Sequence, residues 1–136
     1  MKSKTAFSPE VIERVRQESH GLDEWENPLS GPIPAVDFHH LARRKNNAGH
    51  PMVADYYNCI HLSRKNHERV AEIGLEFPRE WLDFIYAARG HLNFGEVAQW
   101  PTRAAMRAMW YAVQHLYGPP RRRLEIFSGK AEWVDE

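Results

Sequence analysis

One segment of the chain constrains the fold most, because residues 35–74 contain two short strand-like runs followed by a run with helical spacing. Residues 35–42 (AVDFHHLA) alternate in the manner of a β-strand, and a polar loop follows them. Residues 56–62 (YYNCIHL) form a second short run that can pair with the first. Residues 64–74 then predict a helix of about three turns, which Gly74 ends. The segment therefore predicts a ββα unit.

Three further helices are predicted, one before this unit and two after it. The first has Ser8 as its N-cap and Pro9 as its first helical residue, and it ends near His20. The other two begin after Pro78 and Pro101, and their apolar residues recur at helical spacing. The expected fold class is therefore α+β and mainly helical, with an N-terminal helix and a C-terminal helical extension around the ββα unit.

The length of 136 residues suits one domain with a modest core. Composition and pattern divide it into four parts. We expect a flexible lead over 1–8, the ββα unit over 9–76, the helical extension over 77–118 and a charged tail over 119–136.

Charge and cysteine content narrow the class of protein. Lys+Arg and Asp+Glu both number 18, but residues 36–70 hold six basic and three acidic side chains, a local positive surplus. Cys59 is the one cysteine, which excludes an internal disulfide and a CxxC metal site. No apolar run reaches membrane-span length, and the first residues lack the apolar core of a secretory signal. We expect a cytoplasmic protein without a membrane span.

Five of the eight histidines lie between His39 and His67, within the predicted ββα unit. Neighbouring side chains of a strand point to opposite faces, so His39 and His40 cannot do the same work. One suits a metal ligand and the other a general base, since the histidine pKa lies near working pH. Asp37 shares a face with His39. His50 and His61 are expected to be structural.

The motifs FHHL and NCIHLSRKNHERV resemble the HNH endonucleases of the His-Me finger group, in the small form common in bacteriophage genomes. That family places an asparagine in a short strand and a histidine or asparagine nine residues later, as Asn58 and His67 stand here. The resemblance covers residues 9–76. It implies that His40 is the general base, that Asn58 orients it, and that His39 and His67 hold one divalent metal ion. Mg²⁺ or Mn²⁺ is expected, with Ni²⁺ and Zn²⁺ as alternatives.

The segments HGLDEWENP and LSRKNH resemble the zinc knuckle of the same family. Many members hold a structural zinc there on four cysteines, whereas this chain has Asp23, Glu26, Ser63 and Asn66. Serine and asparagine are poor zinc ligands, so no structural zinc is expected. We expect a hydrogen-bonded cluster in its place, with carboxylates facing hydroxyl, amide and backbone N–H groups.

The resemblance implies that the substrate is DNA, in the host cytoplasm if the chain is encoded by a phage. Basic side chains near the motif are expected to contact phosphates, and a solvated charge run is the alternative for them: Arg43, Arg44, Lys45, Arg64 and Lys65. The alternative function is a catalytically inactive HNH-derived module that binds DNA or a protein. The aromatic C-terminal helices are then the candidate surface for a protein partner or a homodimer.

Overall fold

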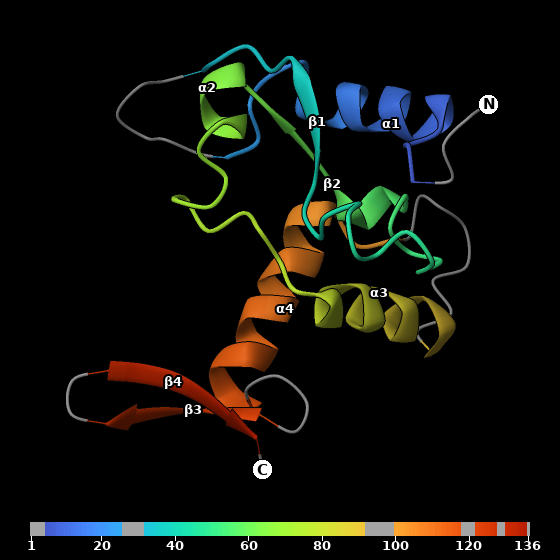
Figure 1. Cartoon of the computed structure of the whole chain (residues 1–136). Helices are drawn as coiled ribbons and strands as arrows, with labels where there is room; N and C mark the ends of the chain where they lie inside the picture. The colour runs from blue at the N-terminus through green and yellow to red at the C-terminus, as the bar shows by residue number, and fades with distance from the viewer. Residues whose placement is uncertain (1–4, 26–31, 92–99, 118–121, 128–129, 136) are drawn as a thin grey trace. The chain divides into compact units, whose positions relative to one another are not determined.

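The computed structural model describes residues 5–25, 32–91, 100–117, 122–127 and 130–135 (Figure 1). Two compact units divide the chain, over residues 1–90 and 91–136. The predicted boundaries at residues 76 and 118 differ from this division. The elements in chain order are α1 (Pro9–Ser19), β1 (Asp37–His40), the 3-10 turn η1 (Tyr56–Asn58), β2 (Cys59–Leu62), α2 (Arg64–His67), α3 (Arg79–His91), α4 (Arg103–Tyr117), β3 (Arg122–Phe127) and β4 (Lys130–Asp135).

A two-stranded antiparallel sheet forms the centre of the first unit. In the register of β1 and β2, His39 lies opposite Ile60 and His40 lies opposite Cys59. Helix α1 packs against β2, and α2 packs against both strands (Figure 1). The predicted class is confirmed at this level: a small α+β fold, mainly helical, with a β-hairpin packed on a helix.

Helix α1 begins and ends where the sequence predicts. Ser8 Oγ accepts a hydrogen bond from Val11 N at 3.2 Å and caps the first turn. His20 adopts a left-handed conformation with φ of 56° and ends the helix. Val15 is fully buried, which fixes the face that α1 turns toward the core.

The predicted three-turn helix over residues 64–74 is wrong in length. Helix α2 covers Arg64–His67 only, and residues 68–74 form turns. The predicted stop is confirmed, since Gly74 has a φ of 76° and Leu75 N donates to Val70 O at 2.8 Å. This bond is the one that closes a Schellman motif. The turns lead to Leu75 and Phe77, which are buried, so tertiary packing overrides the local helical preference.

Helix α3 supplies much of the core of the first unit. Trp81, Leu82 and Ile85 are fully buried, as the predicted apolar stripe requires. Tyr86, which the same stripe included, is 58% exposed. The chain just before α3 pairs with the residues after β1 through an isolated bridge between Ala42 and Phe77. The helix is therefore tied to the strand that carries the two adjacent histidines.

The expected charged tail contains a β-hairpin. Strands β3 and β4 pair antiparallel, with Leu124 opposite Trp133 and Ile126 opposite Ala131. Apolar residues of this region alternate with a period of two, which is the signal of a strand, but many charged side chains lie between them. Among the described residues, no helix has both the length and the apolar character needed to cross a membrane.

Candidate functional site

His39 lies on β1 with its ring buried at 8% exposure. Its Nε2 lies 2.8 Å from the carbonyl oxygen of Leu75. Because a carbonyl only accepts, this nitrogen carries the proton, and Nδ1 keeps its lone pair. Burial lowers the pKa of His39 below its usual value and favours the neutral ring. His39 can therefore act as a ligand through Nδ1.

His67, on α2, faces His39, with ring centroids 5.1 Å apart. Asp37 Oδ2 lies 3.1 Å from His67 Nδ1 and 2.9 Å from Arg64 Nε. That oxygen is buried and has no hydrogen-bond partner, so its contacts with Arg64 and His67 are electrostatic. The carboxylate favours a proton on Nδ1 and leaves Nε2 as the ligand atom of His67.

His40 points to the opposite face of β1, as the alternation predicts. Its Nε2 lies 2.7 Å from the carbonyl oxygen of Thr5, so this nitrogen donates and Nδ1 is the basic atom. The ring of Phe7 stacks on it at a centroid distance of 3.9 Å and an interplanar angle of 13°. Desolvation lowers the pKa of His40 to about 4, which keeps the ring neutral at pH 7.

Asn58 is fully buried. Its side chain was expected to orient His40, but it hydrogen-bonds to other groups. Its Oδ1 accepts from Ala42 N at 2.8 Å and Trp81 Nε1 at 3.1 Å. Its Nδ2 donates to Ala42 O at 3.1 Å and Val53 O at 2.8 Å. These four bonds use the hydrogen-bonding capacity of the amide. Asn58 thus fixes the backbone two residues beyond His40.

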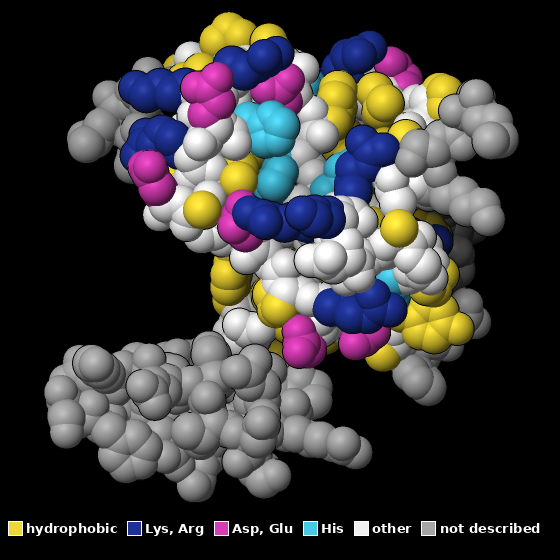
Figure 2. Space-filling view, in the orientation of Figure 1, with side chains coloured by type: hydrophobic (Ala, Val, Ile, Leu, Met, Phe, Trp, Pro, Cys, Tyr) yellow, Lys and Arg dark blue, Asp and Glu magenta, His cyan; other side chains and the backbone are white. Residues whose placement is uncertain are grey.

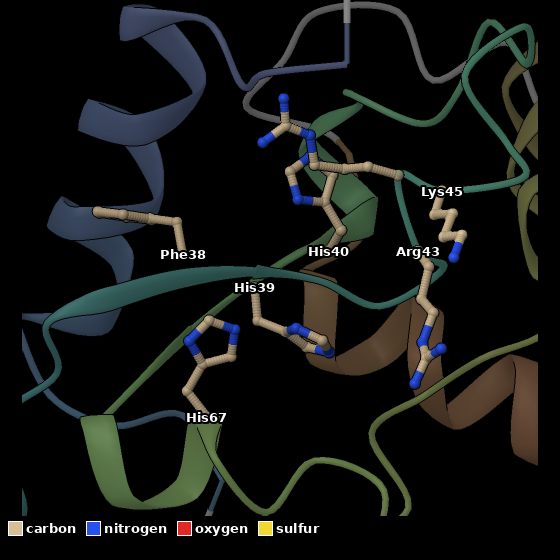
Figure 3. A pocket seen from close by; sticks show the side chains of 7 residues that line it. Phe38, His39, His40, Arg43, Lys45 and His67 are labelled. Atoms are coloured by element: carbon tan, nitrogen blue, oxygen red, sulfur yellow. The ribbon is translucent and has the colours of Figure 1, made fainter.

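A pocket of about 390 Å³ is lined by His39, His40 and His67 (Figure 3). Figure 2 shows histidine side chains on this face with Lys and Arg around them. The pocket combines apolar, imidazole and cationic side chains, a composition suited to an anion. Its lining residues are Phe38, His39, His40, Arg43, Arg44, Lys45 and His67.

The predicted phosphate-binding residues divide into two groups. Arg43, Arg44 and Lys45 line the pocket. Arg64 pairs with Asp37 outside the pocket lining, and the side chain of Lys65 is exposed. Arg43 Nη2 also lies 2.5 Å from Glu76 Oε1, which offsets part of the positive charge. The basic run after β1 is therefore closest to the histidines.

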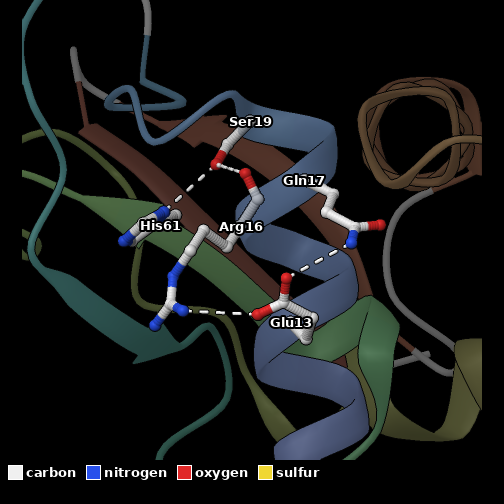
Figure 4. A network of polar contacts seen from close by, with 5 residues as sticks. All are labelled: Glu13, Arg16, Gln17, Ser19 and His61. Carbon is white, nitrogen blue, oxygen red and sulfur yellow. Dashed lines mark hydrogen bonds and ion pairs between the residues drawn. The ribbon is translucent and has the colours of Figure 1, made fainter.

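The two remaining histidines of the segment have structural contacts. His61 Nδ1 lies 3.1 Å from Ser19 Oγ at the end of α1 (Figure 4), and its ring stacks on Phe38. His50 Nε2 donates to Asp83 Oδ1 at 2.8 Å, while its Nδ1 accepts from Met52 N. Neither lines the pocket, so both serve packing, as expected.

The expected hydrogen-bonded cluster forms at three of the four positions that were compared with zinc-binding cysteines. Asp23 Oδ2 accepts from Ser63 N at 2.6 Å and from Asn66 Nδ2 at 3.0 Å. Ser63 Oγ caps α2 by accepting from Asn66 N at 3.2 Å. Glu26 lies outside the described residues. The carboxylate thus ties the segment after α1 to the N-terminus of α2, which carries His67.

The donor set for a metal consists of two imidazoles. Among the described residues, no group of three or more His, Cys, Asp or Glu side chains gathers to hold an ion. Rings that bind one ion through bonds of about 2.0–2.1 Å have centroids roughly 5 Å apart at near-tetrahedral angles. The 5.1 Å between His39 and His67 fits that arrangement. Water and phosphate oxygens would complete the coordination.

Three contributors to the site have no motif in the sequence. The carbonyl groups of Thr5 and Leu75 hold His40 and His39, and Phe7 covers His40. A backbone carbonyl has no residue-type signal, and Phe7 fell within the expected flexible lead. Thr5 and Phe7 are buried at 7% and 8% exposure. Apolar Phe7 beside the N-cap was the one available hint.

Without metal, the protein is expected to lose stability as the pH falls from about 6.5 to about 4. Burial lowers the pKa of both His39 and His40 below the usual histidine value of 6.5, to about 4 for His40. In that window the unfolded chain binds protons that the folded protein does not, so the free energy of unfolding decreases with falling pH. Urea unfolding across the range measures the slope. His40→Gln should flatten it, and an unchanged slope would contradict the assignment.

Comparison with known proteins adds no relative: no family model, curated protein or solved structure matches this chain.

Proposed function

We propose that this protein is a metal-dependent DNA endonuclease that hydrolyses phosphodiester bonds at a single-metal centre of the HNH type. The observation that carries the proposal is the pocket beside β1, where three histidines and three cations meet. Carbonyl oxygens bond one ring nitrogen of His39 and of His40, and Asp37 Oδ2 lies 3.1 Å from Nδ1 of His67, so each ring keeps its other nitrogen for chemistry. Solvated surface histidines would not share this feature.

The general base of the proposed reaction is His40. Burial keeps its ring neutral at pH 7 by lowering the pKa to about 4, and Thr5 O holds Nε2, so Nδ1 is the atom that can accept a proton from water. Arg44 and Lys45 line the same pocket and can contact the phosphate oxygens of the substrate. Such contacts set affinity and position and carry no base preference.

The metal would be held by His39 and His67. A bound divalent ion supplies charge stabilisation for the phosphate and the leaving oxygen. Imidazole ligands suit Ni²⁺ and Zn²⁺, while Mg²⁺ and Mn²⁺ would take most of their ligands from water and phosphate. Leu75 O and Asp37 orient the two rings from behind, as partners of metal-bound histidines do.

One observation favours the second candidate, an inactive module that binds DNA or a protein. The described residues offer two metal ligands and no third side chain in reach. Such a module would bind DNA or protein without cleaving DNA.

Calorimetric titration with Mn²⁺ tests the metal site and separates the two candidates. Wild type is expected to bind one ion. His39→Ala and His67→Ala should each weaken binding by more than about 10-fold, since each removes a ligand. His40→Ala is the matched control and should bind as wild type does, because its ring lies on the other face of β1. An unaffected His67→Ala would contradict the ligand assignment, and no uptake by wild type would favour the inactive module.

A further inference from the structure

A short segment before α1 lies against the candidate base. Thr5 and Phe7 are buried at 7% and 8% exposure, although Ser8, directly after them, is exposed. They come from the N-terminal end of the described chain, whereas His40 lies at the end of β1. The burial of this segment is unexplained by the packing of α1, whose buried residue is Val15.

Three contacts join the segment to the pocket. The carbonyl oxygen of Thr5 accepts from His40 Nε2 at 2.7 Å. The ring of Phe7 stacks on the imidazole at 3.9 Å, nearly parallel at 13°. Thr5 Oγ1 also accepts from Arg44 Nε at 2.8 Å. One segment thus contacts both the base and a cation that lines the pocket.

The two contacts to His40 fix different properties of its ring: the orientation of the ring plane and the nitrogen that carries the proton. A stacked neighbour sets the plane of the imidazole, since rotation about the Cβ–Cγ bond would break the stack. The carbonyl sets which nitrogen carries the proton, because it accepts only from an N–H. Together the two contacts leave Nδ1 unprotonated and hold its lone pair in one direction. The second contact depends on the first, because a ring that rotates about the Cβ–Cγ bond carries Nε2 away from Thr5 O, and either nitrogen can then hold the proton.

We propose that Thr5 and Phe7 are positioning residues of the catalytic centre, which hold the His40 ring so that Nδ1 faces the attacking water. The inference rests on the proposed function of His40 as the base. The segment also orients Arg44 through the Thr5 hydroxyl, so base and phosphate contact are set by the same few residues. Neither Thr5 nor Phe7 touches the reacting atoms.

The test uses the full chain with Phe7→Ala, Phe7→Leu and Phe7→Tyr. Alanine and leucine remove the aromatic plane, and leucine keeps most of the apolar volume; tyrosine keeps the ring. Tyr86→Ala is the control, because it removes an exposed aromatic ring of α3. Side-chain ¹⁵N NMR of the metal-free protein reads the His40 tautomer, and plasmid cleavage with Mn²⁺ gives kcat and KM. Circular dichroism checks that each variant is folded.

Wild type and Phe7→Tyr should show one His40 tautomer, protonated at Nε2. Phe7→Ala and Phe7→Leu should show averaged nitrogen shifts and a kcat lower by about 10- to 100-fold, with KM unchanged. Averaged shifts with normal cleavage, or an unchanged tautomer in both variants, would overturn the proposal. If wild type does not cut DNA, the proposed nuclease function fails, and the NMR result still decides whether the segment holds the ring.

Discussion

Replacing His40 with alanine is expected to slow plasmid cleavage by about 10²- to 10⁴-fold, the usual contribution of a general base. The physical reason is that Nδ1 of His40 is the basic atom of the pocket, held neutral by burial that lowers its pKa to about 4. Conversion of supercoiled plasmid to the nicked form with saturating Mn²⁺ measures the rate. Circular dichroism establishes that the variant is folded.

Two comparisons separate a base from a structural residue. Added imidazole should restore part of the activity of His40→Ala, because the pocket of about 390 Å³ has room for a free base near the missing ring. His20→Asn is the matched control, since this exposed histidine has a left-handed φ of 56° that asparagine tolerates. Cleavage by His40→Ala at the wild-type rate would refute the assignment of the base.

The sequence predicted which histidines meet, but it did not predict what holds them. His39, His40 and His67 line one pocket, and their spacing indicated this because strand alternation and helix direction depend on local pattern. The groups behind the rings are Leu75 O and Thr5 O, which are 36 and 35 residues away from their partners. Such contacts depend on tertiary packing, and backbone atoms have no signature in a sequence.

In the fold, too, features set by neighbours in sequence were predicted, and features set by tertiary packing were not. Capping and proline signals placed α1 well, since Ser8 and His20 act through neighbours in sequence. The end of α2 was set by a competition between helical propensity and the burial of Leu75, and local pattern weighs only the first. In the C-terminal hairpin the alternation was present but accompanied by many charges. There the sequence held the signal, and the composition was misleading.

Replacing Asn58 with alanine is expected to lower the free energy of unfolding by about 3–5 kcal/mol, a large part of the stability of a small domain. The side chain is fully buried and makes four hydrogen bonds. Its loss leaves the N–H and C=O of Ala42, Val53 O and Trp81 Nε1 with fewer partners in the interior. Urea unfolding followed by circular dichroism measures the change.

Asn58→Asp tests whether hydrogen bonding or volume matters, because aspartate fills nearly the same space. It replaces the Nδ2 donor with an oxygen that faces the carbonyls of Ala42 and Val53, so it should be as damaging as alanine. Asn47→Ala is the matched control: its side chain makes two hydrogen bonds, to Arg43 O and Arg79, and it should lose about 1–2 kcal/mol. If Asn58→Asp unfolds at the wild-type urea concentration, the amide does not hold the backbone next to His40.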